Sequence, residues 1–350
     1  MTTQKTVLDQ ISSRAWEHPA DRAALNSLKK VPGLNKLLSM LFGATSERSL
    51  RLMYLASAVR VSDKQFLRVK LLFDEVCKTF DVEKRPEVYV SQSTLLNAFA
   101  VGMDNPFIVL NSGLVECLDD EELTEVLGHE LGHIMSGHML YRTLFIILQK
   151  ISKSLVQFPV PNWIFSGVYY ALQEWSRKSE LSADRAGLLA TQNPDISLRV
   201  AMKLAGGNFE QMDVAAFLEQ AEEYNKNDNA GDTVFKFLNI IGQSHPFAST
   251  RALEIVNWVR SGDYDATLQG VYPRRTDAEK NASVWEDVKE ASEGYANDFK
   301  EATQSTRNAA NSSQFNEEFK KTAQNVSEKM DETSKKAKEF FDDFFKNKNS

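Results

Sequence analysis

The chain of 350 residues has little of what several protein classes require. Its two cysteines, Cys77 and Cys117, lie in stretches typical of regular elements, so no disulfide framework is expected. The net charge of −7 lacks the basic excess of nucleic-acid-binding proteins, so nucleic acid is not expected as a partner. The first residues show no basic stretch followed by an apolar run, which predicts no secretory signal and a cytoplasmic protein.

Long apolar runs are also scarce. Residues 141–148 (YRTLFIIL) are too few to cross a bilayer, which requires about 20 apolar residues. Residues 155–173 are uncharged but contain Pro159 and Pro161, which interrupt a helix. We expect both segments to be buried or interfacial rather than membrane-spanning.

The periodicity of the apolar residues changes along the chain. Residues 1 to about 80 have helical spacing, and Asp119 or Asp120 is a good start for a later helix. Short β-branched and aromatic stretches predict strands at 86–92, 97–102 and 106–114. Further helices are predicted at 166–190, 195–206, 211–225 and 248–260. The expected fold class is therefore α+β, mostly helical, with helices around a small sheet.

Residues 281–350 differ in composition from the rest. They contain no proline, one glycine, and 11 basic against 14 acidic residues. Their apolar pairs recur every eleven residues, or 3.67 per helical turn, which predicts one apolar stripe along a nearly straight helix. Two interpretations remain open: a solvated or self-packed helical tail, or an amphipathic helix that binds a lipid surface or a hydrophobic partner. In the second, residues 338–348 (KEFFDDFFKNK) are the most apolar end.

The sequence GHELGH at 128–133 contains a metal-binding pattern. His129 and His133 lie about 40° apart around a helix, so both imidazoles can reach one metal ion. Glu130 lies beside that site, where a carboxylate can take a proton from water. This arrangement is typical of zinc hydrolases.

A third ligand must come from elsewhere in the chain. The spacing H-E-x-x-H-x-x-G-x-x-H is not met, because Met139 stands at the last position, and His138 is better explained by an orienting or packing role. Glu180 and Asp184 are four residues apart on one predicted helical face. Glu180 could complete a two-histidine, one-glutamate site, and Asp184 could accept a hydrogen bond from a ligand imidazole. The alternative is an ordinary solvent-facing helix.

Five motifs occur in the order found in gluzincin-type zinc metallopeptidases such as HtpX and the type I CAAX prenyl protease, which this chain resembles between about residues 60 and 260. They are NAFAVG at 97–102, LNSGLV at 110–115, GHELGH, the Glu180–Asp184 pair and SHPFASTRALEI at 244–255. The resemblance implies a zincin-like fold with one Zn²⁺ per chain, held by His129, His133 and Glu180. This chain departs from the membrane-bound members because it has no convincing membrane-spanning segments, so neither an intramembrane substrate chamber nor prenylated substrates are expected.

The resemblance also implies roles around the metal. Asn97, Ala98, Phe99 and Ala100 would form an edge strand that pairs with an extended substrate. His245 would stabilise the oxyanion of the tetrahedral intermediate, although a capping or packing role stays open. Arg251 would organise that segment or contact substrate, unless it makes a purely structural ion pair.

These observations predict three parts: an N-terminal helical segment (1–60), a zinc metallopeptidase domain (61–275) and the amphipathic tail (281–350). The expected activity is zinc-dependent endopeptidase cleavage of extended or unfolded protein segments, with Glu130 as general base. The alternative is a non-catalytic or tightly gated zinc-binding protein whose tail contacts membrane surfaces or partner helices. His18 is expected at the surface.

Overall fold

A computed structural model of the chain describes residues 5–31, 33–34, 37–38, 47–103, 105–152, 162–207, 209–226 and 247–275. Apart from residues 225 and 226, these belong to one unit, residues 1–224 and 244–294. The predicted tail (281–350) and His245 lie outside the described residues. The predicted boundary at residue 60 remains a prediction.

Four strands form one small sheet in the order β1-β2-β4-β3. The strands are β1 (Ala58–Arg60), β2 (Glu87–Ser91), β3 (Ala98–Val101) and β4 (Phe107–Asn111). β2 and β4 pair in parallel, and the other two pairs are antiparallel. All five residues of β4 are buried, as its β-branched and aromatic composition requires for a central strand. β3 lies at the edge of this sheet.

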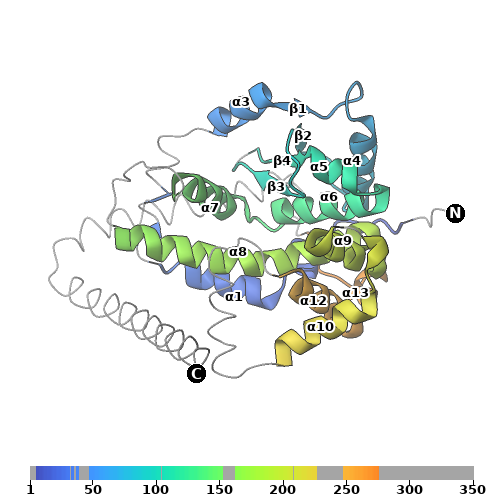
Figure 1. Cartoon of the computed structure of the whole chain (residues 1–350). Coiled ribbons are helices and arrows are strands. Elements are labelled where there is room, and N and C mark those ends of the chain that lie inside the picture. Colours follow the sequence, from blue (N-terminus) through green and yellow to red (C-terminus); the bar gives the residue numbers. More distant parts are fainter. Residues whose placement is uncertain are drawn as a thin grey trace, which may run out of the picture. The chain divides into compact units, whose positions relative to one another are not determined.

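Helices make up most of the described structure, which confirms the predicted mostly helical α+β class. They are α1 (Pro19–Leu28), α3 (Glu47–Ser57), α4 (Leu67–Thr79), α5 (Ser112–Cys117), α6 (Asp120–Met135), α7 (Met139–Ser152), α8 (Asn162–Thr191), α9 (Pro194–Gly206), α10 (Val214–Lys226), α12 (Ala248–Arg260) and α13 (Asp263–Leu268), with short 3₁₀ turns at Ser13–Ala15 and Phe209–Gln211. Figure 1 shows α6 and α8 side by side, with the sheet on one side of the pair and α1 and α12 on the other.

Helix α6 begins where the sequence predicted. The Asp119 carboxylate accepts a hydrogen bond from the Glu122 backbone N–H at 2.9 Å, and the Glu122 carboxylate accepts one from the Asp119 backbone N–H at 2.9 Å. Such a reciprocal cap satisfies two backbone donors that the first turn of a helix leaves free. It fixes the start, and therefore the register, of the helix that carries GHELGH.

Two glycines allow α6 to lie very close to α8. A Cβ atom on Gly128 would overlap the Ala190 side chain, and one on Gly132 would overlap the Ala186 side chain. Since glycine costs about 1 kcal/mol relative to alanine inside a helix, its use twice on this face requires a packing reason. The close approach brings the buried face of α8, including Glu180, within reach of the α6 histidines.

The N-terminal residues belong to the main hydrophobic core. Leu8, Ile11 and Trp16 are buried in the same cluster as the inward side chains of α4, α6 and the sheet. The Trp16 indole packs edge-on against Phe80, with ring centroids 5.4 Å apart, and its N–H donates to Ser136 Oγ at 3.1 Å. The first residues are therefore built into the fold that positions α6.

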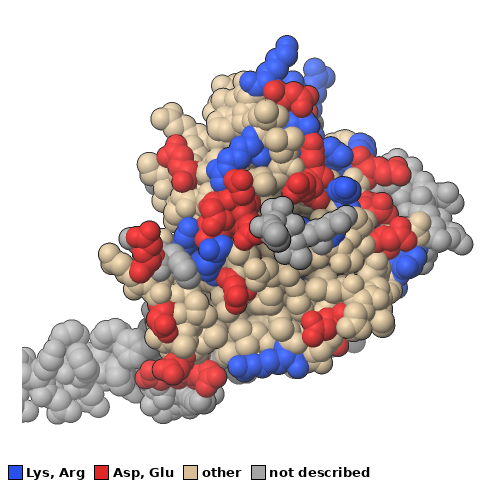
Figure 2. All heavy atoms as spheres, turned by 90° about the vertical axis from the view of Figure 1, so that its right-hand side faces the viewer, with Lys and Arg blue, Asp and Glu red and all other residues tan. Residues whose placement is uncertain are grey.

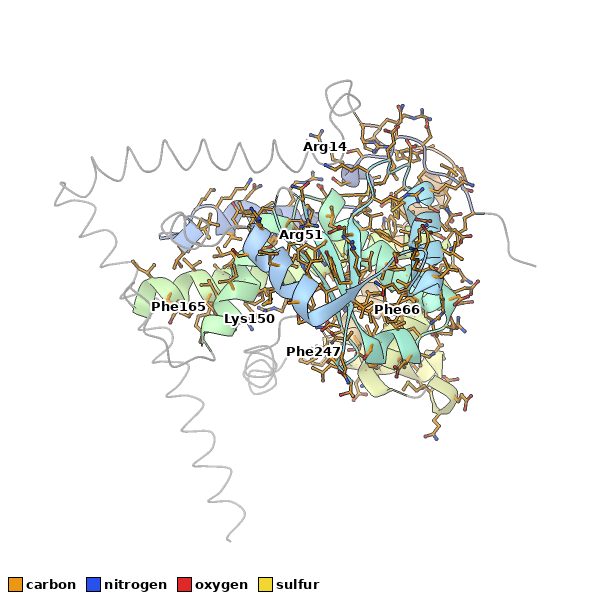
Figure 3. All side chains as sticks on the ribbon, turned by 90° about the horizontal axis from the view of Figure 1, so that it is seen from above. Arg14, Arg51, Phe66, Lys150, Phe165 and Phe247 are labelled. Atoms are coloured by element: carbon orange, nitrogen blue, oxygen red, sulfur yellow. The ribbon has the colours of Figure 1, made fainter. Side chains whose placement is uncertain are left out.

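The sequence analysis missed helices α7 and α13, and α5 begins at Ser112, inside the strand predicted at 106–114. Strand β1 was also missed, because residues 1–80 were expected to be helical throughout. Its three residues pair with β2, from Ala58 opposite Ser91 to Arg60 opposite Tyr89. Three residues are too few to show an alternating apolar pattern, and this strand depends on a partner that is distant in the sequence. Arg51 of α3, labelled in Figure 3, strengthens the contact by an ion pair with Glu87 of β2.

Helices α7 and α8 pack together, and α7 also contacts the edge strand β3. Their ends, marked by Lys150 and Phe165, lie next to each other in Figure 3. The rings of Phe145 on α7 and Tyr169 on α8 are 5.5 Å apart. No helix within the described ranges is both long enough and apolar enough to cross a membrane.

Charged side chains of both signs are interspersed on the face shown in Figure 2. This face carries no broad basic area of the kind that nucleic-acid binding requires.

The close contact between α6 and α8 predicts that Gly132→Ala destabilises the protein by about 1–3 kcal/mol, because the new methyl group forces the two helices apart. Gly167→Ala on α8 is the matched control, since nothing lies within 4 Å of its new Cβ. That change is expected to stabilise the helix by up to about 1 kcal/mol. Urea denaturation of both variants measures the difference, and equal effects would contradict the proposed packing role.

The two free thiols are predicted to differ in reactivity. Cys77 is buried, and burial raises the pKa of its thiol to about 12, whereas Cys117 is exposed. Because the thiolate is the reactive form, a thiol reagent at neutral pH should label one cysteine per native chain and two after denaturation. Cys117→Ser should abolish native labelling; labelling of Cys77 in the native variant would show that the α4 core is open.

Candidate active site

Helix α6 carries three functional side chains of the predicted site on its buried face. His129 and His133 are 6% and 0% exposed, and Glu130 is 3% exposed. All three are held by the packing of α6 against α8 and the sheet. Their conformations are therefore restricted before any ligand binds.

The ligand atoms of His129, His133 and Glu180 converge on one point. The two histidine Nε2 atoms are 3.2 Å apart, and Glu180 carboxylate oxygens lie 3.4 Å from His129 Nε2 and 3.2 Å from His133 Nε2. Zinc bonds of about 2.0–2.1 Å in a tetrahedral site separate neighbouring ligand atoms by roughly 3.3 Å. Two imidazole nitrogens and one carboxylate at this spacing fit a zinc ion and leave a fourth position free.

Glu130 provides a second observation that fits such a site. Its Oε2 is buried and accepts no hydrogen bond from any described residue. A buried carboxylate oxygen without a hydrogen-bond donor is energetically costly. The unpartnered Glu130 oxygen therefore indicates that a bound polar ligand supplies the donor. A water molecule beside the metal position would supply the missing donor.

Asp184 and Arg251 hold the first histidine in place. His129 Nδ1 is 3.0 Å from Asp184 Oδ1, and because a carboxylate only accepts, the imidazole is the donor. In neutral His129 the lone pair therefore lies on Nε2, which faces His133 and Glu180. Arg251 donates to both oxygens of Asp184, with its Nε 2.8 Å from Oδ2, so the pair is bidentate.

His133 has a different neighbour. Its Nδ1 is 3.0 Å from His138 Nδ1, and both rings are buried. The sequence predicted an orienting or packing role for His138, and the structure places it in direct contact with this predicted ligand.

Arg142 contacts the site although the sequence did not single it out. Its guanidinium, on α7, donates to Glu180 Oε1 at 2.6 Å, and both side chains are buried. Arg251 Nη1 lies 3.9 Å from the other Glu180 oxygen. Two cations thus balance the buried Glu180 and Asp184. No local sequence signal distinguished Arg142 from a surface arginine.

The charges around the site shift the pKa values of its groups. Burial favours neutral His129, but its hydrogen bonds to Asp184 and Glu180 outweigh this and raise its pKa to about 10. Burial and the nearby Arg142 cation lower the pKa of His133 well below its ordinary value. Burial would raise the pKa of Asp184, but Arg251 and His129 hold it below its ordinary range. Metal binding at His129 therefore competes with a proton.

The predicted substrate-binding residues lie on and before the edge strand β3, which is in contact with α6. Asn97 is exposed and Phe99 is half-buried, whereas Ala98 and Ala100 are buried. Just beyond β3, Thr143 of α7 bonds to Gly102: its hydroxyl accepts from the backbone N–H at 3.0 Å and donates to the carbonyl at 2.8 Å. The strand is therefore fixed at one end beside the helix of the histidines.

The structure brings together most of the predicted site. His129, Glu130, His133, Glu180 and Asp184 lie in one buried cluster, and the half-buried Arg251 contacts it through Asp184. Glu180 and Asp184 are buried, so their helix is not the solvent-facing one that the sequence left open. His245 precedes Phe247, the first residue described at the start of α12 and labelled in Figure 3, and lies outside the described residues.

Comparisons with known proteins agree with this chemistry. The profile of Peptidase family M48 matches residues 63–259. The "Plastoglobule-localized metallopeptidase 48, chloroplastic" of Arabidopsis thaliana is 35% identical over 263 residues, 73% of this chain and 75% of that protein. "Protease HtpX homolog 1" of Streptomyces coelicolor is 29% identical over 196 residues, 49% of this chain and 64% of that protein. No solved structure matches the chain. The extent of the profile match and the coverage of the plant relative show that the chain belongs to peptidase family M48, a family of zinc-dependent metallopeptidases.

Proposed function

We propose that the chain is a zinc endopeptidase that hydrolyses peptide bonds in extended or unfolded protein segments, with His129, His133 and Glu180 as the zinc ligands. The observation that carries this proposal is the convergence of the three ligand atoms, 3.2–3.4 Å apart, next to the unpartnered Glu130 oxygen. These three residues would hold a zinc ion, which would supply a water molecule of lowered pKa that is nucleophilic at neutral pH.

Glu130 acts as the general base in this proposal. Its buried Oε2 accepts a proton from the attacking water and then delivers it to the amine of the leaving peptide. Asp184 fixes His129 in the tautomer with its lone pair on Nε2, and Arg251 fixes Asp184 through two hydrogen bonds. Arg251 thus supports the site by ion pairing, which agrees with the structural alternative for this residue.

The edge strand β3 is the proposed substrate platform. A peptide added beside residues 97–100 would form main-chain hydrogen bonds that do not depend on its side chains. Such binding favours extended substrates, since a folded segment cannot offer a free strand. Access is best at the exposed Asn97 and the half-buried Phe99. His245 is proposed as the donor that stabilises the oxyanion.

The sequence of the tail supports a second candidate function. The eleven-residue apolar period of residues 281–350 supports contact with a lipid surface or a partner helix. A location at plastoglobules is part of the name of the Arabidopsis relative, which supports peripheral contact with a lipid surface here as well. Under this alternative, the protein binds zinc but is non-catalytic or tightly gated, and the tail performs the biological role.

Glu130→Gln is predicted to leave zinc content at one ion per chain and to lower the cleavage rate of unfolded casein by at least about 10²-fold, because the general base is lost. Glu121→Gln, the same change on the exposed side of α6, should cleave like the wild type. Wild-type protein that binds zinc yet cleaves no faster than Glu130→Gln would favour the non-catalytic alternative.

Deletion of residues 281–350 is predicted to leave cleavage of a short peptide within about twofold of the full chain and to abolish flotation with lipid vesicles. The physical reason is that the tail supplies amphipathic area, whereas all residues proposed for the site lie between Asn97 and Arg251. Loss of short-peptide cleavage would show that the tail is part of the catalytic structure.

A further inference from the structure

A carboxylate from the N-terminal helix is linked to the metal site through His138. Asp21 lies in the first turn of α1, which runs alongside α8 (Figure 1), and its side chain is 2% exposed. Its Oδ2 is 3.0 Å from His138 Nε2, and His138 Nδ1 is in turn 3.0 Å from His133 Nδ1. Asp21, His138 and His133 thus form a continuous hydrogen-bonded chain that ends at a proposed zinc ligand.

The chemistry of these groups sets the direction of each hydrogen bond. Asp21 Oδ2 accepts the Ser182 hydroxyl at 2.6 Å and lies 3.0 Å from His138 Nε2, which is the geometry of an ionised carboxylate that accepts from both groups. The ionised carboxylate can only accept, so His138 Nε2 carries the hydrogen. When His138 is neutral, its lone pair is therefore on Nδ1, and His133 Nδ1 must be the donor. This leaves the lone pair of His133 on Nε2, the atom that faces His129 and Glu180.

Asp21 is itself held rigidly. Ser182 of α8 donates to Asp21 Oδ2 at 2.6 Å, and the same hydroxyl accepts from the backbone N–H of His18 at 2.9 Å. The His18 side chain caps α1 through a hydrogen bond from Ala20, and its Nε2 lies 3.3 Å from Glu254 of α12. His18 is therefore half-buried and structural, not the surface residue that the sequence predicted. Ser182 lies midway between Glu180 and Asp184, so α1 is tied to the part of α8 that serves the metal.

The His138 ring has little freedom to turn. The Trp175 indole packs against the imidazole almost at a right angle, with ring centroids 5.6 Å apart and an interplanar angle of 86°. His138 is 2% exposed, so water cannot easily replace Asp21 as its acceptor.

We infer that Asp21 is a positioning residue of the metal site: through His138 it fixes the tautomer and orientation of His133. This inference rests on the proposed function, because it requires a metal ion at His129, His133 and Glu180. It gives each histidine ligand its own carboxylate, Asp184 directly for His129 and Asp21 through an intervening imidazole for His133. The second carboxylate comes from α1, which precedes the region matched by the family profile.

Asp21→Asn is the sharpest test, because the amide has the same shape but carries a donor and no charge, so it no longer fixes the proton on His138. Zinc affinity measured by chelator competition is expected to fall 10–100-fold, the usual effect of losing a partner of a metal-ligating histidine. The zinc affinity of Asp21→Ala should fall by at least the same factor. Leu28→Ala is the control, since it loosens α1 at a buried position that has no part in the hydrogen-bonded chain. Its zinc affinity should stay within about threefold of wild type.

The outcomes separate the two proposals. Wild-type protein without zinc affinity would overturn both. Wild type that binds zinc, with Asp21 variants within about threefold of it, would overturn the role of Asp21 and leave the proposed function intact. An equal loss of zinc affinity in Leu28→Ala would overturn the positioning role and show that Asp21 only stabilises α1. If the Asp21 variants do not fold, two-bond ¹H–¹⁵N spectra of zinc-loaded wild type decide: hydrogen on Nδ1 of His133 and on Nε2 of His138 supports the inference, and the opposite tautomers overturn it.

Discussion

The contact between helices α6 and α8 is the constraint on which the rest of the site depends. Gly128 and Gly132 meet Ala190 and Ala186 across this interface, and larger side chains would hold the helices apart. A carboxylate on α8 can reach two imidazoles on α6 only at this close approach. Gly128 and Gly132, next to the histidines, therefore allow the close approach of the two helices, which the metal-binding pattern alone does not explain.

Close packing places several charged groups in a region with little water. Burying a charge is costly unless it is paired, and here Glu180 and Asp184 face Arg142 and Arg251. The arginines come from α7 and α12, so these ion pairs also link both helices to α8. A metal ion adds positive charge to this balance, which favours the neutral form of His129 over the protonated one.

Residues whose roles follow from local spacing could be predicted from the sequence. The cap at Asp119 and the pair His129 and His133 are each recognisable within a few residues, whereas Glu180 and Asp184 became candidates only because GHELGH precedes them. Strand β1, Arg142 and Asp21 could not be predicted, because each acts through a partner that is distant in sequence. Asp21 and His138 are 117 positions apart in the sequence. The packing of α1 on α8 brings them together. His18 was misjudged for the same reason.

The central claim is that three side chains from two closely packed helices hold one zinc ion. The most direct test is the zinc content of purified wild-type protein and of Glu180→Ala, measured by elemental analysis on the same day with circular dichroism to verify folding. The account predicts about one zinc per wild-type chain and its loss from the folded variant. Zinc retained at full occupancy by folded Glu180→Ala would contradict the assignment of the third ligand and, with it, the role given to the α6–α8 contact.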